Sequence, residues 1–257
     1  MLAIERRNKI LAILQKESRV VVSDLSKAFN VTEETIRRDL DKLEKDGFAK
    51  KAYGGAIINE SGNVDLPFTV RKTTNVTGKQ KIADIIASMV EDGDHIMLDA
   101  SSTAVYIAKQ LRTKKNLTLI TNSIEILLEL SDVTGWKVLS TGGMVKEGSL
   151  SLVGYQAEKM IDSFHVDKVI ISCKGLDIEK GITDSNEMEA HVKKLMIDAA
   201  NQKILAADST KFDKISFTRI SDLSEINMIV TDKEPDSKWM NMANSLDVPI
   251  FHEVVSE

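Results

Sequence analysis

A short stretch near the amino terminus constrains this chain more than any other, because its apolar residues recur at helical spacing. Ile36, Leu40 and Leu43 lie four and three residues apart, so on a helix they form one narrow stripe. Thr32 is suited to cap the start of this helix, and Gly47 is suited to end it. The pattern predicts a helix between these two residues that is buried along one edge only.

The other edges of that helix are polar. At about 100° per residue, Arg38 and Glu34 point away from the stripe, while Thr35 and Arg37 flank it. Arginine can bond base edges or hold phosphate, so these positions suit insertion into a groove of DNA. An ordinary amphipathic surface helix would show the same stripe, and this helix alone does not separate the two interpretations.

The neighbouring segments favour DNA binding. Ser23 is suited to cap a short upstream helix, and Asn30 is suited to make the turn that follows it. A short helix, a tight turn and a longer helix with a polar outer face form a helix-turn-helix. An earlier helix at 4–16 would close its core, and a basic hairpin, or wing, would follow at 48–58.

This arrangement resembles the DNA-binding domain of the DeoR family of bacterial transcriptional regulators. The resemblance rests on Arg6, on the run Thr35-Ile36-Arg37-Arg38-Asp39-Leu40 and on Tyr53-Gly54-Gly55-Ala56. Lys51 and Tyr53 stand where the family often has Arg and His, but both still offer donors to phosphate. The pattern and the resemblance together predict these DNA-binding residues: Ser23, Thr32, Glu34, Thr35, Arg37, Arg38, Lys42, Lys50, Lys51 and Tyr53.

Charge divides unevenly along the chain, whose net charge is −5. Residues 1–58 hold 12 Lys and Arg against 9 Asp and Glu, whereas residues 59–257 hold 22 against 30. The first part is therefore basic by three charges and the rest acidic by eight. This asymmetry supports a basic DNA-reading head on an acidic body.

Length and composition limit the remaining choices. With 257 residues, 42% of them hydrophobic and 28% charged, the chain is long enough for two globular domains. The single cysteine, Cys173, excludes an intramolecular disulfide and fits a reducing cytosol. No apolar run is long enough to span a membrane, and no signal-peptide core is found. We therefore expect a cytoplasmic protein without membrane attachment.

Beyond the head, short apolar runs alternate with helical patterns. Strands are predicted at 95–99, 117–121, 136–140, 166–173, 204–208, 227–231 and 249–254, and helices at 104–111, 124–130, 156–161 and 187–200. Strands separated by helices predict a mostly parallel sheet covered on both faces. The predicted architecture is α/β, with a winged helix-turn-helix domain at 1–58, a linker at 59–77 and a second domain at 78–257.

Parallel sheets bind ligands at the carboxyl ends of their strands, and small, polar or charged residues follow the predicted strands there. Ser101, Ser102 and Thr103 also precede the helix at 104–111. Free backbone N–H groups at such a helix start can hold a phosphate. Simple N-capping would explain one of these hydroxyl residues without any ligand.

The same loops resemble the effector domain of the DeoR family, whose fold is similar to that of ribose-5-phosphate isomerases. The resemblance implies that these loops bind a phosphorylated sugar or a related intermediate. Lys174 stands where many members have a small residue, so the ligand could differ from the commonest ones. The implied effector-binding residues are Asp99, Ser101, Ser102, Thr103, Thr121, Asn122, Gly142, Gly143, Lys174, Gly175, Asp177, Glu189, Asp208 and Lys211.

Three functions follow from these patterns. The first is a ligand-responsive repressor of a sugar-utilisation operon, and the second is a sugar-phosphate isomerase-like enzyme with an accessory DNA-binding head. The third is an architectural DNA-binding protein without an effector. A DNA-reading motif has little use on a metabolic enzyme, which favours the first. We therefore predict a non-enzymatic regulator of double-stranded operator DNA, a dimer or tetramer, without cofactor or metal, since the four histidines lack metal-ligand spacing.

Overall fold

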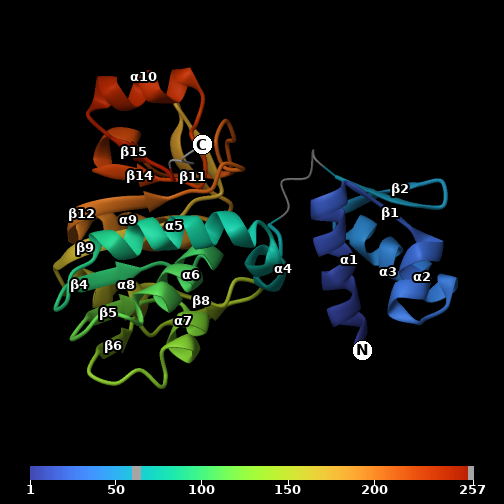
Figure 1. Cartoon of the computed structure of the whole chain (residues 1–257). Helices are drawn as coiled ribbons and strands as arrows, with labels where there is room; N and C mark the ends of the chain where they lie inside the picture. Colours follow the sequence, from blue (N-terminus) through green and yellow to red (C-terminus); the bar gives the residue numbers. More distant parts are fainter. Residues whose placement is uncertain (60–64, 254–257) are drawn as a thin grey trace. The chain divides into compact units, whose positions relative to one another are not determined.

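The computed structural model describes residues 1–59 and 65–253 and divides into two compact units, Met1–Thr74 and Asn75–Glu257 (Figure 1). Each unit has its own hydrophobic core. In the described part of the chain, no helix is long and apolar enough to cross a membrane.

The amino-terminal unit is a winged helix-turn-helix, as predicted. Its elements are α1 (Ala3–Glu17), β1 (Arg19–Val21), α2 (Val22–Phe29), α3 (Glu33–Lys45), β2 (Ala49–Ala52), β3 (Gly55–Ile58) and α4 (Phe68–Thr73). Strand β1, which was not predicted, pairs with β3 to make an antiparallel sheet of order β1-β3-β2. The predicted stripe of Ile36, Leu40 and Leu43 is buried against α1.

The ends of the two central helices follow local rules, with one correction. Thr32 caps α3 by accepting a hydrogen bond from the backbone N of Thr35 at 3.2 Å, as predicted. At the other end, Gly47 has a φ of +81°, and its N donates to the carbonyl of Glu44 at 2.9 Å. The predicted cap by Ser23 is wrong, because α2 begins at Val22, directly after β1 pairs with the wing, and Ser23 lies inside the helix.

The structure differs from the predicted linker at 68–73, where α4 forms. Phe68 and Val70 of α4 are buried, and Val70 belongs to the core of the amino-terminal unit. The side chain of Asn8 in α1 donates to Thr69 Oγ1 at 3.1 Å. These few apolar residues anchor a segment that polar neighbours made look like a linker. Residues 60–64 of the predicted linker lie outside the described residues.

The second unit is built on a parallel sheet. Its elements are α5 (Val76–Met89), β4 (His95–Leu98), α6 (Ser102–Leu111), β5 (Thr118–Thr121), α7 (Ile124–Glu129), β6 (Lys137–Ser140), β7 (Met144–Lys146), β8 (Ser151–Val153), α8 (Tyr155–Asp162), β9 (Val166–Ile171), β10 (Gly175–Asp177), β11 (Gly181–Asp184), α9 (Glu187–Asp198), β12 (Ala200–Ala206), β13 (Thr218–Ser221), η1 (Leu223–Glu225), β14 (Met228–Val230), α10 (Ser237–Leu246) and β15 (Ile250–Phe251). The seven predicted strands form one sheet of order β15-β14-β12-β9-β4-β5-β6, in which the neighbouring strands run parallel.

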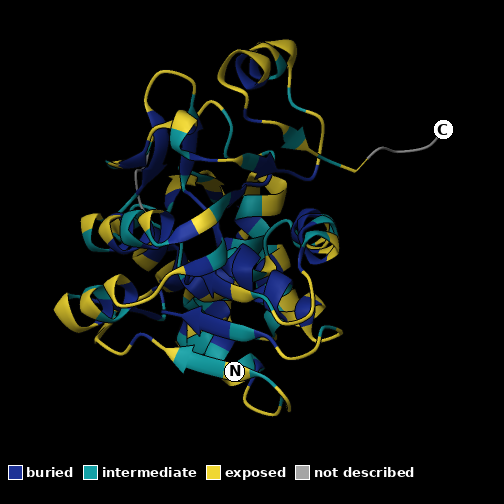
Figure 2. Cartoon of the chain, turned by 90° about the vertical axis from the view of Figure 1, so that its left-hand side faces the viewer, coloured by how far each residue is buried: buried dark blue, intermediate teal, exposed yellow. Residues whose placement is uncertain are grey.

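Both faces of this sheet are covered, as predicted. Met97, Val169 and Leu205 share a core with helices α8 and α9. Their neighbours Ile96 and Ile170, which point to the opposite face, are also fully buried. Figure 2 shows the buried residues concentrated on the central strands. The prediction missed two small antiparallel additions, the hairpin β7-β8 and the sheet β10-β11-β13.

Candidate functional site

Helix α3 presents arginines to solvent. The side chains of Arg37 and Arg38 are 56% and 77% exposed. Each is held along the helix by a glutamate one turn earlier, Arg37 by Glu33 at 2.6 Å and Arg38 by Glu34 at 3.2 Å. Exposed ion pairs of this kind contribute little stability, so both arginines can exchange their glutamates for phosphates or base edges at small cost.

The wing lies next to α3. Lys51 of β2 bonds Asp41 of α3 at 2.5 Å and approaches Glu44 at 3.6 Å, and the hydrogen bond to Asp41 raises the pKa of Lys51. Lys51 therefore holds the wing to α3 rather than projecting freely. Tyr53, at the tip of the hairpin, is fully exposed, and Lys50 is exposed on β2.

The remaining predicted DNA-binding residues have local partners. Lys42 bonds Asp46 at 2.8 Å one turn further along α3. Thr35 Oγ1 lies 2.9 Å from Thr32 Oγ1, so both hydroxyls belong to the start of the helix. Ser23 is half-buried in α2. All ten predicted residues thus lie on α2, on the wing, or on α3 and its cap.

A buried ion pair in this unit was not predicted. Asp39 of α3 is 3% exposed, and one of its oxygens accepts from Arg6 Nε at 2.5 Å. Its other oxygen lies 3.6 Å from Arg7. The pair joins α1 to α3 and fixes the orientation of the helix that carries the exposed arginines. Its signal in the sequence was a charged residue three positions after Ile36, on the buried stripe.

In the second unit, the parallel sheet brings the ends of β4 and β9 together at Asp99. This residue is 1% exposed, and its two carboxylate oxygens accept from the backbone N of Ser101 at 3.1 Å and of Ser172 at 2.9 Å. Asp99 therefore joins two strand ends. Asp99 is one of the predicted effector-binding residues, and both of its carboxylate oxygens already have protein partners.

Lys193, which the sequence reasoning missed, lies at the centre of this edge. Its Nζ bonds Asp184 Oδ2 at 2.5 Å and the carbonyl of Ser172 at 2.9 Å, and it lies 3.3 Å from Asp99 Oδ2. Burial lowers the pKa of Lys193, but the two carboxylates more than offset it and raise the pKa above its ordinary value. The feature of the sequence that could have identified Lys193 is its position four residues after Glu189, which places both on the buried face of α9.

Glu189, also on α9, lies beside this ion pair. Its side chain is 10% exposed, and Oε1 accepts from Ser151 Oγ at 2.9 Å. Its Oε2 lies 3.4 Å from Lys146 Nζ of strand β7. The β7-β8 hairpin, which was not predicted, thus brings a second lysine besides Lys193 close to Glu189, one of the predicted effector-binding residues.

Asp208 and Lys211 follow β12 at the same edge. Burial raises the pKa of Asp208, but the charge of Lys211 and hydrogen bonds from Thr210 bring it below its ordinary value. The charge of Lys79 acts in the same direction, and Lys79 is only 4% exposed. Lys79 was missed because it lies in the first turn of α5, next to the predicted linker.

Other predicted ligand residues stabilise the loops. Ser101 Oγ caps α6 through the backbone N of Ala104 at 3.0 Å, which matches simple N-capping, and Ser102 and Thr103 are buried in the first turn. Thr121 Oγ1 donates to a carbonyl of β4 at 2.8 Å. Asn122 donates to the carbonyl of Leu152 at 3.1 Å, while its Oδ1 is buried and accepts no hydrogen bond from the described residues.

Two predicted ligand residues serve the antiparallel sheet instead. Gly175 lies in β10, where a Cβ would come 2.4 Å from the carbonyl oxygen of Lys214, so close backbone packing explains the glycine. Asp177 accepts from the backbone N of Glu179 and Lys180 and so closes the turn to β11. The sequence placed both after a strand of the parallel sheet because it did not anticipate the hairpin.

Three further predicted effector-binding residues lie in loops that follow strands of the parallel sheet. Lys174 is half-buried; burial raises the pKa of Asp184, but the charge of Lys193 and, next to it, that of Lys174 bring this pKa below its ordinary value. Gly142 and Gly143 are exposed between β6 and β7. None of the three has a contact that identifies a ligand.

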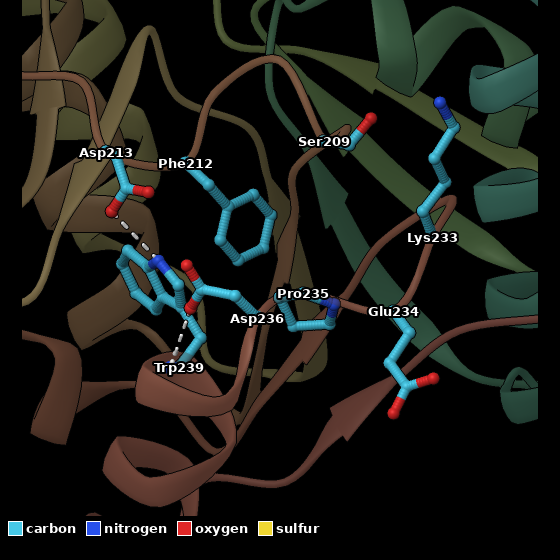
Figure 3. A pocket seen from close by; sticks show the side chains of 8 residues that line it. All are labelled: Ser209, Phe212, Asp213, Lys233, Glu234, Pro235, Asp236 and Trp239. Carbon is cyan, nitrogen blue, oxygen red and sulfur yellow. Dashed lines mark hydrogen bonds between the residues drawn. The ribbon is translucent and has the colours of Figure 1, made fainter.

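A pocket of about 240 Å³ opens beside the loop after β12 (Figure 3). The ring of Phe212 meets that of Trp239 edge to face at 4.9 Å, and Trp239 Nε1 donates to Asp213 Oδ1 at 3.0 Å. Three of its side chains are carboxylates, which makes the pocket unsuited to a phosphate. Its lining residues are Ser209, Phe212, Asp213, Lys233, Glu234, Pro235, Asp236 and Trp239.

The second unit carries a charged cluster at its strand ends, made of Lys79, Asp99, Asp184, Glu189, Lys193, Asp208 and Lys211. A winged helix-turn-helix with exposed arginines, joined to a unit with such a cluster, defines a DNA-binding regulator with a separate sensing domain. Residues 6–62 match the DeoR-like helix-turn-helix domain, and residues 74–233 match the DeoR C terminal sensor domain. The chain belongs to the DeoR family of transcriptional regulators, as the sequence predicted.

The chain is similar to two relatives over nearly its full length and theirs. The chain is 44% identical to the uncharacterized HTH-type transcriptional regulator YulB of Bacillus subtilis, over 92% of this chain and 91% of that one. It is 36% identical to the HTH-type transcriptional regulator GolR of Listeria innocua, over 97% and 98%. These relatives are regulators, and the chain is a regulator rather than an enzyme. Among solved structures, it is similar to ribose 5-phosphate isomerase A of Methanocaldococcus jannaschii, with 16% identity, a TM-score of 0.40 and coverage of 54% and 55%.

Proposed function

We propose that the chain represses a carbohydrate-utilisation operon and that a phosphorylated sugar changes its affinity for the operator. The observation that carries this proposal is the mixed charge at the strand ends of the second unit. Lys79 and Lys211 lie near Asp208, where they suit a phosphate. Carboxylates such as Asp208 and Glu189 suit sugar hydroxyls.

The names of two relatives support parts of this proposal, the first the repression of an operon and the second a sugar operon. One is the putative aga operon transcriptional repressor of Escherichia coli O157:H7, and another is the L-fucose operon activator of Haemophilus influenzae. We further propose that the chain acts in the cytoplasm as a dimer or tetramer. Pairing of two DNA-binding units would match two half-sites about one helical turn, or a multiple of it, apart.

The effector is tested by calorimetric and thermal-shift screening of ribose 5-phosphate, deoxyribose 5-phosphate, glucose 6-phosphate and fructose 1-phosphate beside their unphosphorylated parents. At least one phosphorylated sugar should bind and its parent should bind far less well, because charged contacts to the phosphate are lost. Lys211→Ala should weaken binding of the responding sugar phosphate by about thirtyfold, which corresponds to about 2 kcal/mol. Lys174→Ala should weaken it as well.

Lys214→Ala is the matched control, because Lys214 is exposed and lies three residues beyond Lys211. It should leave sugar-phosphate binding unchanged, and all three variants should bind operator normally without effector. An equal response to sugar and sugar phosphate, or a bound ligand that is indifferent to Lys174 and Lys211, would show that this edge is not the effector site.

The operator-binding surface is tested by Arg37→Ala and Arg38→Ala. Each should weaken operator binding by about 1–3 kcal/mol without unfolding the protein, because both side chains are exposed. Arg38→Ala should act more on base discrimination. Arg37→Ala should act more through phosphate and lower the salt slope by about one. Fluorescence anisotropy with an operator fragment at several salt concentrations measures both.

Arg112→Ala is the control for this surface. It removes the same charge from the second unit, where Arg112 pairs with Asp132, and it should leave operator binding unchanged. Wild-type affinity in both α3 variants would exclude α3 as the recognition helix.

A further inference from the structure

The first turn of α5 begins the second unit. Asn75, its N-cap, adopts the left-handed conformation with a φ of +47°. The division between the two compact units falls directly before it, after Thr74. Any displacement of this turn therefore acts on the chain segment that continues into the DNA-binding unit.

Asp232, at the end of β14, binds this turn to the loop that follows β12. Its Oδ1 accepts from the backbone N of Ser209 at 2.6 Å. Its Oδ2 lies 3.3 Å from both Asn75 Nδ2 and Ser209 Oγ. Asp232 is 4% exposed. The hydrogen bond between Asn75 and Asp232 thus joins residues that are 157 positions apart in the sequence.

The backbone of α5 lies close against this contact. A Cβ on Gly78 would come 2.5 Å from Asn75 Nδ2 and 2.6 Å from Asp232 Oδ2, so any side chain there would displace the two side chains that make this contact. The next residue, Lys79, is buried, and its charge acts on Asp208. The start of α5 therefore holds both Asn75, which bonds Asp232, and Lys79, which is a cation of the charged cluster.

We propose that the hydrogen bond between Asn75 and Asp232 couples the effector site to the DNA-binding unit. This inference rests on the proposed sugar-phosphate effector. A phosphate at the charged cluster attracts Lys79 and Lys211 and changes the positions of the first turn of α5 and the loop after β12. Asp232 bonds both segments, so its bonds to them differ between the free and the bound protein. Such a difference between two states is what allosteric coupling requires.

Two variants remove this bond in different ways. Asn75→Asp places a second carboxylate opposite that of Asp232, and two acceptors of like charge cannot bond. Asn75→Gly removes the side chain and tolerates a positive φ, so it breaks the contact without straining the backbone. In the double variant Asn75→Asp/Asp232→Asn, the carboxylate and the amide exchange places and the hydrogen bond is restored.

The measurement is the ratio of operator dissociation constants with and without a sugar phosphate. The probe is whichever of the four screened sugar phosphates gives the largest thermal shift of the wild-type protein. For the wild type, we expect this ratio to lie in the usual allosteric range of about 5–150-fold. In each single variant it should fall below about twofold, and the double variant should regain most of the wild-type ratio.

Two further results are required. The affinity of the DNA-free variants for the probe should stay within about threefold of wild type, because Asp232 is engaged by protein groups rather than by the effector. The matched control Asn241→Asp makes the same change at an exposed position of α10 and should keep the wild-type ratio.

The outcomes separate the two proposals. A wild-type ratio in Asn75→Asp and Asn75→Gly overturns the coupling contact and leaves the proposed function intact. Loss of coupling in Asn75→Asp without recovery in the double variant also overturns it, because the loss would then come from the added carboxylate rather than from the broken hydrogen bond. If the wild-type protein responds to none of the four sugar phosphates, both proposals fail.

Discussion

Replacing Lys193 by methionine is expected to lower the free energy of unfolding of the second unit by about 3–5 kcal/mol. Methionine fills a similar volume, but it leaves the buried carboxylates of Asp184 and Asp99 without their cation. Each of these aspartates is 1% exposed, so water does not replace the lost charge. A loss of this size is a large fraction of the stability of an ordinary domain.

Tryptophan fluorescence during urea unfolding measures this loss, because both tryptophans, Trp136 and Trp239, lie in the second unit. Lys194→Met is the matched control. Lys194 also contacts two carboxylates, Asp198 and Glu225, each at 2.6 Å, but its side chain is 34% exposed. The control should therefore lose less than about 1 kcal/mol.

The pH dependence of the Lys193→Met variant provides a second test. In the wild type, burial raises the pKa of Asp184, but Lys193 and other groups bring it below the ordinary value. That stabilisation is present above the ordinary aspartate pKa and is lost as the pH falls through the lowered one. In the variant, the uncompensated carboxylate of Asp184 should have a raised pKa, so the deficit in the free energy of unfolding should shrink between about pH 7 and pH 5. A small or pH-independent loss of unfolding free energy in Lys193→Met would contradict the ion pair between Lys193 and Asp184.

Replacing Asp39 by alanine should have an equally large effect on the DNA-binding unit. The change leaves Arg6 buried without a counter-ion, which costs about 3–5 kcal/mol. The core of this unit is small, so we expect it to unfold at temperatures where the second unit remains folded. Operator binding should disappear over the same temperature range, because α3 loses its attachment to α1.

Hydrogen exchange of the α3 amides measures this opening and separates it from a direct role in DNA contact. Asp41→Ala is the control, because Asp41 on the same helix pairs with Lys51 at 2.5 Å and is 55% exposed. It should change stability by less than about 1 kcal/mol. If the α3 amides of Asp39→Ala are protected from hydrogen exchange as in the wild type but operator affinity is lost, Asp39 contributes to DNA binding directly rather than through the fold.

The accuracy of the sequence predictions varied with the kind of element. The seven strands of the parallel sheet were found because each is a short apolar run between helical patterns, although only the central strands are largely buried on both faces and the edge strands β6 and β15 are not. The hairpin β7-β8 and the sheet β10-β11-β13 were missed, because each of their strands holds only one or two apolar residues among polar residues and glycines. Without the hairpin β7-β8, Lys146 was not recognised as a neighbour of Glu189.

The sequence alone determined the family, the two-part architecture and the edge of the sheet where the charged residues gather, because these depend on local periodicity and on the order of strands. Only the tertiary structure decided the partners of the charged groups. Lys193 meets Asp99, and Asn75 meets Asp232, across separations that no local pattern encodes. A buried charge is stabilised by whichever groups the folded chain brings within a few ångströms. The division of these residues between structural support and effector binding therefore depends on packing.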